Sequence, residues 1–217
     1  MAEVFALVLA RFSNLVLLIP CKTGTRCVYG LWEMEGIDED LEALAEEAAR
    51  GDEGAFRRIY EALIDQVFRY FYWALGSREE AEDLAVETFA RCFAAVVRFD
   101  RRKASLRTWV FSVARNLLVD HLRRRGKARW EGLESAEGVP VESAEDRWEE
   151  EERNRMVREV LLELPDTYRQ VLVMKYFLGM DNGEVGKVLG KSPGAVNALR
   201  IRALRRLGKA LEEKGWA

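Results

Sequence analysis

The chain of 217 residues has few of the side chains from which catalytic and metal sites are built. It contains one histidine, His121, and three cysteines, a set that offers no zinc-ligand spacing. Paired carboxylates and an activated nucleophile are also missing from the pattern, so we expect no enzyme, no metal, no cofactor and no small-molecule substrate. Three scattered cysteines build no disulfide framework, which favours a reducing, cytoplasmic compartment.

Proline is scarce as well, with four in the chain, and period-two runs of β-branched residues are nearly absent. With 49% hydrophobic residues, this composition predicts a folded, all-α protein and excludes a disordered one. The apolar run at residues 4–19 is interrupted by Arg11 and Asn14, so it falls short of a clean membrane span. From Met34 the sequence reads like an ordinary acidic start. We expect residues 1–33 to be an extension from a mis-assigned start, with a membrane anchor or interfacial helix as the alternative.

The net charge of −3 hides a strong segregation of charge along the chain. Residues 98–129 hold eleven basic and two acidic side chains, and residues 185–211 hold seven basic and no acidic ones. Between them, residues 130–152 hold ten acidic side chains. Two basic segments joined by an acidic one predict two nucleic-acid contacts on one tether. Solvated helix faces are the alternative, but they do not explain the basic excess at 98–129.

Hydrophobic periodicity and capping residues predict helices separated by glycine and proline. We expect two small helical domains, residues 38–125 and 148–213, joined by an acidic flexible linker at 126–147. The predicted helices span residues 38–49, 53–75, 78–97, 106–125, 149–163, 166–178, 182–189 and 193–213.

The last two of these helices have the order of a helix-turn-helix: a short apolar helix, a tight turn and a long basic helix. Gly186 would let the two backbones approach, and Asp181 or Asn182 would cap the first helix. Ser192 is a natural N-cap for the second, followed by Pro193. The residues expected to pack the helices together are Val185, Val188 and Leu189 on the first and Val196, Leu199 and Ala203 on the second.

The N-terminal end of such a basic helix meets base edges in the major groove of duplex DNA, and the rest of it suits phosphates. A solvated basic surface is the alternative; the turn chemistry and the absence of acidic residues favour DNA. The candidate base-reading residues are Lys191, Ser192, Gly194, Ala195, Asn197 and Ala198, and the candidate phosphate contacts are Arg200, Arg202, Arg205 and Arg206.

The other basic segment combines the loop 99–105 with a helix that has a core stripe at Trp109, Val113, Leu117 and Leu118. Thr108, Ser112 and Val119 are expected on the opposite, mainly polar side, and His121 at the surface or at a cap. A basic surface with nearby aromatic rings is typical of proteins that bind single-stranded or melted nucleic acid. The candidate contacts to an opened strand are Arg101, Arg102, Lys103, Arg107, Ser112, Arg115, Asn116, Arg123 and Arg124.

The helix expected at residues 78–97 carries a charged line at i, i+4 and i+8, formed by Asp83, Glu87 and Arg91. Leu84, Phe89 and Phe93 are expected to anchor its other face. The charged line allows pairing of Glu87 with Arg91, which stabilises a helix by a few tenths of a kcal/mol. Either a protein partner or a solvated face explains the line equally well.

Taken in order, the segments GDEGAFRRIYEALIDQVFRY, EEAEDLAVETFARCF, SLRTWVFSVARNLLVDHLRRR and LPDTYRQVLVMKYFLGM, followed by the helix-turn-helix, resemble a bacterial RNA polymerase sigma factor of the extracytoplasmic-function group. The resemblance spans residues 38–213. Val86 stands where a glutamine is usual, and Asn197 and Ala198 stand where many members have Lys-Ser. Residues 1–33 have no counterpart in that pattern.

The resemblance implies a transcription initiation factor that binds core RNA polymerase through Asp83, Glu87 and Arg91. Residues 101–125 would hold the melted minus-ten element, and the helix-turn-helix would read the minus-thirty-five element as duplex. The acidic linker would thread toward the polymerase channels, and an anti-sigma factor is a common partner. The competing interpretation is a stand-alone helix-turn-helix regulator with a helical sensing or dimerisation domain, which would bind a palindromic duplex without polymerase.

Overall fold

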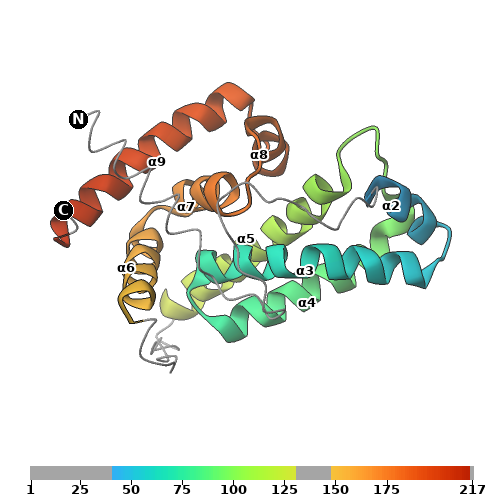
Figure 1. Cartoon of the computed structure of the whole chain (residues 1–217), viewed down its shortest axis with the longest axis horizontal. Helices are drawn as coiled ribbons and strands as arrows, with labels where there is room; N and C mark the ends of the chain where they lie inside the picture. The colour runs from blue at the N-terminus through green and yellow to red at the C-terminus, as the bar shows by residue number, and fades with distance from the viewer. Residues whose placement is uncertain (1–40, 131–147, 216–217) are drawn as a thin grey trace.

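The computed structural model describes residues 41–130 and 148–215, and every regular element in this part of the chain is helical (Figure 1). The predicted all-α class is therefore confirmed. The extension at 1–33 and residues 131–147 of the predicted linker lie outside the described residues. None of the described helices is both long enough and apolar enough to cross a membrane.

The first helical bundle is built on local capping signals that are visible in the sequence. The Asp52 carboxylate accepts hydrogen bonds from the backbone N–H groups of Gly54 and Ala55, at 2.8 and 3.1 Å. The Ser77 hydroxyl accepts one from Glu80 at 3.3 Å, as the predicted cap requires. The elements of this bundle are α2 (Leu41–Ala49), α3 (Glu53–Leu75), α4 (Arg78–Ala95), the short 3₁₀ turn η2 (Val96–Arg98) and α5 (Leu106–Trp130).

The second bundle follows the predicted helices closely. Asp181 begins α8 with a complete capping box, in which its carboxylate accepts from the Glu184 N–H and the Glu184 carboxylate accepts from the Asp181 N–H, both at 2.8 Å. The elements are α6 (Trp148–Glu163), α7 (Asp166–Leu172), the wide turn η4 (Val173–Phe177), α8 (Asn182–Leu189) and α9 (Pro193–Glu213).

Two predicted boundaries were wrong. Helix α5 continues to Trp130, five residues past the predicted end at Arg125, so the first residues assigned to the linker are helical. The helix expected at 166–178 keeps α-helical geometry only to Leu172 and then widens into π-type hydrogen bonding in η4. Phe177, the last residue of η4, is 2% exposed.

The two bundles lie against each other, α8 packing on α5 and η4 on α3 (Figure 1). The ring centroids of Trp73 and Phe177 are 4.3 Å apart, and both side chains are buried. The Arg158 guanidinium lies 4.4 Å from the centroid of the Tyr72 ring, within cation–π range. The described residues thus form one continuous hydrophobic core that draws on both bundles.

Candidate nucleic-acid interface

The turn between α8 and α9 is built as its residues predict. Gly190 ends α8 in the left-handed region at φ 65°, which glycine adopts without a Cβ clash. Ser192 caps α9 by accepting a hydrogen bond from the Ala195 N–H at 3.2 Å, and Pro193 occupies the first turn. A Cβ on Gly186 would lie 2.6 Å from the Lys191 carbonyl oxygen, so the predicted close approach of the backbones is real.

The predicted packing of the two helices is also confirmed. Val185 and Val196 are fully buried, and Leu199 is half-buried against the core. This packing leaves the turn and the start of α9 facing outward. Lys191 and Ser192 in the turn and Gly194 and Ala195 in α9 are exposed, whereas Asn197 and Ala198 are half-buried.

The arginines along α9 are placed unequally. Arg202, Arg205 and Arg206 are exposed, as a phosphate-binding surface requires. Arg200 is half-buried and donates to the Asn197 Oδ1 at 3.0 Å and to the Tyr176 hydroxyl at 3.3 Å. Arg200 therefore orients the amide of Asn197, one of the candidate base readers. Sequence reasoning missed Tyr176, because its contact with Arg200 depends on the folding of η4 against α9.

The loop before α5 forms the second basic surface. Arg101, Arg102 and Lys103 are all exposed. Asp100 accepts from the Arg102 backbone N–H at 3.0 Å and from its Nε at 3.3 Å, and the backbone hydrogen bond in particular holds the pKa of Asp100 below its usual range. A cavity of about 290 Å³ lies between this loop and α2, lined by residues 99–102 and by Ala45, Glu46 and Ala49.

The polar face of α5 agrees only in part with the prediction. Asn116, Arg123 and Arg124 are exposed, whereas Ser112 and Arg115 are half-buried, the Ser112 hydroxyl donating to the Thr108 carbonyl oxygen at 2.7 Å. Thr108, predicted on this face, is 1% exposed. It is buried because it completes the start of α5: its N–H donates to the Ser105 hydroxyl at 3.2 Å, and that hydroxyl donates to the Thr108 Oγ1 at 2.9 Å.

Two further side chains of this helix face protein. Arg107 Nε donates to the Gln66 Oε1 at 3.1 Å, and its guanidinium also donates to the Leu178 carbonyl oxygen of the second bundle. Burial lowers the pKa of this guanidinium. His121, expected at the surface or at a cap, is half-buried with its Nε2 3.1 Å from the Glu80 Oε1. In the described arrangement, Arg107 is held between the bundles.

Helix α4 presents a charged line beside an apolar stripe. Asp83, Glu87 and Arg91 are exposed, and the predicted Glu87–Arg91 pair forms at 2.8 Å. Phe93, expected to anchor the other face of the helix together with Leu84 and Phe89, is 51% exposed and meets the Phe56 ring edge-on at 4.9 Å. Exposed apolar residues lie at helical spacing along one face of α4, and Val97 in η2 follows them, a spacing that was visible in the sequence: Val86, Ala90, Phe93 and Ala94.

This geometry defines a protein with two basic surfaces and a mixed apolar and charged helix face, and comparison with known families gives the class. Residues 59–128 match the model of Sigma-70 region 2, and residues 154–207 match that of Sigma-70, region 4. The two matches together cover more than half of the chain, which therefore belongs to the sigma-70 family.

Individual relatives give the group within that family. The chain is 31% identical over 172 residues to the ECF RNA polymerase sigma factor BldN of Streptomyces coelicolor, a match over 78% of this chain and 65% of that protein. It is 32% identical over 175 residues to the ECF RNA polymerase sigma factor SigW of Bacillus subtilis, covering 76% of this chain and 92% of the relative. The chain is an extracytoplasmic-function sigma factor, a transcription initiation factor.

Solved structures show the same fold. CnrH in complex with the cytosolic domain of CnrY is 25% identical, with a TM-score of 0.60 over 79% of this chain and 96% of that one. The sigma factor RpoE of Bartonella quintana, solved with the anti-sigma factor NepR, is 19% identical with a TM-score of 0.61 over 72% and 96% of the two chains. The likeness to RpoE concerns the fold alone.

Proposed function

We propose that this sigma factor reads promoters in two parts, with its first bundle on the melted minus-ten element and its second on the minus-thirty-five duplex. The observation that supports this is the presence of two exposed basic surfaces on different bundles, at loop 99–105 and along α9. Each phosphate neutralised by an arginine or lysine releases counterions, so both contacts should weaken with salt. The residues assigned to the duplex are Lys191, Ser192, Gly194, Ala195, Asn197, Ala198, Arg200, Arg202 and Arg205.

At the minus-ten element the loop provides the first contacts. The exposed cations Arg101, Arg102 and Lys103 suit the phosphates of an opened strand, and Asn116, Arg123 and Arg124 continue the surface along α5. Arg107 is half-buried and already donates to Gln66 and to the Leu178 carbonyl. A guanidinium has five N–H donors, so Arg107 could give a phosphate only the donors that these two contacts leave over.

Core polymerase would bind α4. An apolar stripe about two helical turns long on α4, rimmed by Asp83, Glu87 and Arg91, has the composition of a protein interface and not that of a solvated face. The factor would work in the cytoplasm, where polymerase acts, and would contribute no catalysis of its own. An anti-sigma factor would be a further protein partner, and the structure of CnrH, solved in complex with the cytosolic domain of CnrY, supports the binding of such a partner.

The experiment measures binding of the purified chain to core polymerase and, separately, to DNA. We expect association with core polymerase and only weak binding to duplex DNA without it. The variant Val86→Asp, which places a charge in the stripe at a residue 60% exposed, should weaken core binding without unfolding the chain. Tight binding of a palindromic duplex by the free chain, with no binding to core polymerase, would instead support the stand-alone regulator.

A further inference from the structure

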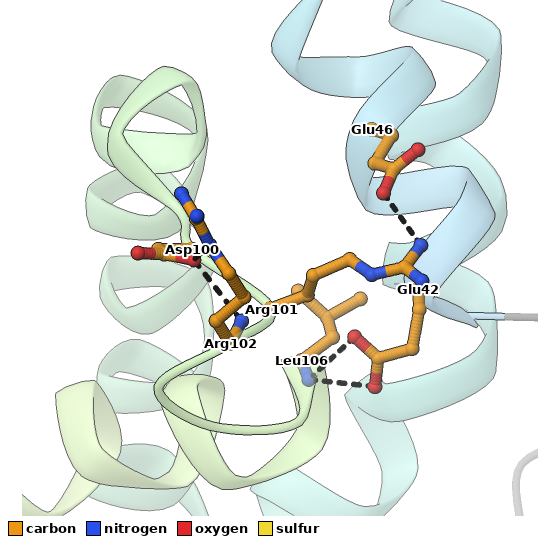
Figure 2. A network of polar contacts seen from close by, with 6 residues as sticks. All are labelled: Glu42, Glu46, Asp100, Arg101, Arg102 and Leu106. Atoms are coloured by element: carbon orange, nitrogen blue, oxygen red, sulfur yellow. Dashed lines mark hydrogen bonds and ion pairs between the residues drawn. The ribbon is translucent and has the colours of Figure 1, made fainter.

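Helix α2 precedes the residues matched to Sigma-70 region 2, yet it is joined directly to the loop assigned to the minus-ten element. Glu42 and Glu46 lie one turn apart on α2 and both point toward the loop (Figure 2). The two oxygens of the Glu42 carboxylate share one bifurcated hydrogen bond from the Leu106 N–H, at 3.0 and 3.2 Å. Glu46 Oε1 accepts from Arg101 at 2.7 Å. These contacts bridge more than fifty residues of sequence.

The contact of Glu42 sets where α5 begins. The first N–H groups of a helix have no partner within it, and a carboxylate there also meets the positive end of the helix dipole. Ser105, the residue just before α5, already accepts from the Thr108 N–H, so Leu106 takes its acceptor from α2 instead. The first residue of α5, which directly follows the loop, is thereby tied to α2, and the loop has a fixed end.

The contact of Glu46 pairs its carboxylate with a positive charge of the loop, that of Arg101. Its pair with Arg101 is exposed, with 59% and 49% of the two side chains open to solvent, so it contributes little to folding. It does hold the guanidinium against α2, as Figure 2 shows. A phosphate of the opened strand must compete with the Glu46 carboxylate for Arg101.

We propose that α2 controls the minus-ten loop in two opposite ways: Glu42 is a positioning residue that strengthens binding of the opened strand, and Glu46 weakens that binding by occupying Arg101. The proposal rests on the proposed function of loop 99–105. The acidic side chains of α2 would then regulate promoter opening. The proposal predicts that removing Glu42 and removing Glu46, one turn apart, change binding of the opened strand in opposite directions.

The test uses holoenzyme assembled from the full chain and core polymerase. The probe is a forked DNA from a start site that this holoenzyme uses, with the upstream element as duplex and the minus-ten element as non-template single strand. Binding is measured from low to high salt. Glu47→Ala is the matched control, because it removes one negative charge from the same helix. Among the described contacts, the Glu47 carboxylate makes no hydrogen bond to the loop.

Glu42→Ala should weaken binding of the fork by up to about tenfold, the limit reached if the whole stabilisation by the cap is needed to hold the loop for binding, while binding of the upstream duplex stays unchanged. Glu42→Gln, which keeps an acceptor oxygen, should recover most of the loss. Equal losses on the fork and on the upstream duplex, or no rescue by glutamine, would overturn the positioning role.

Glu46→Ala should strengthen binding at low salt and steepen the salt dependence by about one single-strand phosphate contact, a slope change of roughly 0.7. In an Arg101→Ala background the same change should have no effect beyond that of Glu47→Ala. An unchanged salt slope would overturn the competition. Lys103→Ala distinguishes failure of the loop's proposed function from failure of this inference. If Lys103→Ala and Arg101→Ala both leave fork binding unchanged, the proposed function of the loop is wrong. If both weaken fork binding while the Glu42 and Glu46 variants have no effect, only this inference is overturned.

Discussion

Replacing Gly186 by alanine should destabilise the protein, although alanine is the better helix former. Gly186 lies inside α8, where alanine would normally stabilise by up to about 1 kcal/mol. The new Cβ, however, would lie 2.6 Å from the Lys191 carbonyl oxygen and 3.7 Å from the Pro193 nitrogen. These are backbone atoms of the turn, so the turn must shift. Overpacking of this kind costs about 1–3 kcal/mol.

The net loss for Gly186→Ala is therefore about 1–2 kcal/mol, or a fall in melting temperature of several degrees at about 2–4 °C per kcal/mol. Gly208→Ala is the matched control, because Gly208 lies inside α9 and a Cβ there would meet nothing within 4 Å. That variant should be stabilised by about 0.5–1 kcal/mol. Thermal denaturation followed by circular dichroism measures both. A Gly186→Ala protein as stable as the Gly208→Ala protein would refute the close-packed turn.

Four more outcomes are expected. Phe93→Ala should lower the melting temperature by only a few degrees, because the ring is 51% exposed and its main packing is on Phe56. It should weaken binding to core polymerase, measured by fluorescence anisotropy, and an unchanged affinity would remove Phe93 from the interface. Burial raises the pKa of the Cys92 thiol to about 12, so peptide mapping should find it unalkylated at pH 8 in the native protein and alkylated in denaturant. Arg202→Ala with Arg205→Ala should lower the salt slope of holoenzyme binding to upstream duplex by about two phosphate contacts, and an identical slope would count against phosphate binding. Asp181→Ala should cost about 1 kcal/mol at neutral pH in urea denaturation. Because the hydrogen bond from the Glu184 N–H lowers the pKa of Asp181, this stabilisation is present above about pH 4 and is lost as the pH falls further, whereas Asp181→Asn should keep the cap and lose the pH dependence.

The parts of the fold that local chemistry decides could be predicted from the sequence. The bounds of α8 and α9 follow from Asp181, Gly190 and Ser192, since a cap acts within a few residues of itself. The packing of the two helices could be predicted from their apolar spacing, because only a short turn separates them along the chain. Helix α5 ran past its predicted end because a glycine alone does not stop a helix. Gly126 lies inside α5, and an added Cβ there would meet nothing within 4 Å.

The candidate sites could be predicted as surfaces but not as contacts. The exposed cations of loop 99–105 were visible as a charge excess, whereas their restraint by Glu42 and Glu46 depends on α2 folding back across more than fifty residues. Arg107 looked like its basic neighbours in sequence, and its burial follows from the approach of Leu178 from the second bundle. Phe93 was misplaced because an apolar residue at helical spacing fits a protein interface as well as a core.

The central claim is that one chain directs core polymerase to promoters read in two parts. The most direct measurement is transcription of the source organism's fragmented genomic DNA by core polymerase with and without the purified chain, followed by mapping of the RNA 5′ ends. The account predicts new start sites that depend on the chain and share two upstream elements at a fixed spacing, with the nearer element reactive to permanganate as melted DNA. Start sites that do not change when the chain is added, or that share a single palindromic element, would contradict it.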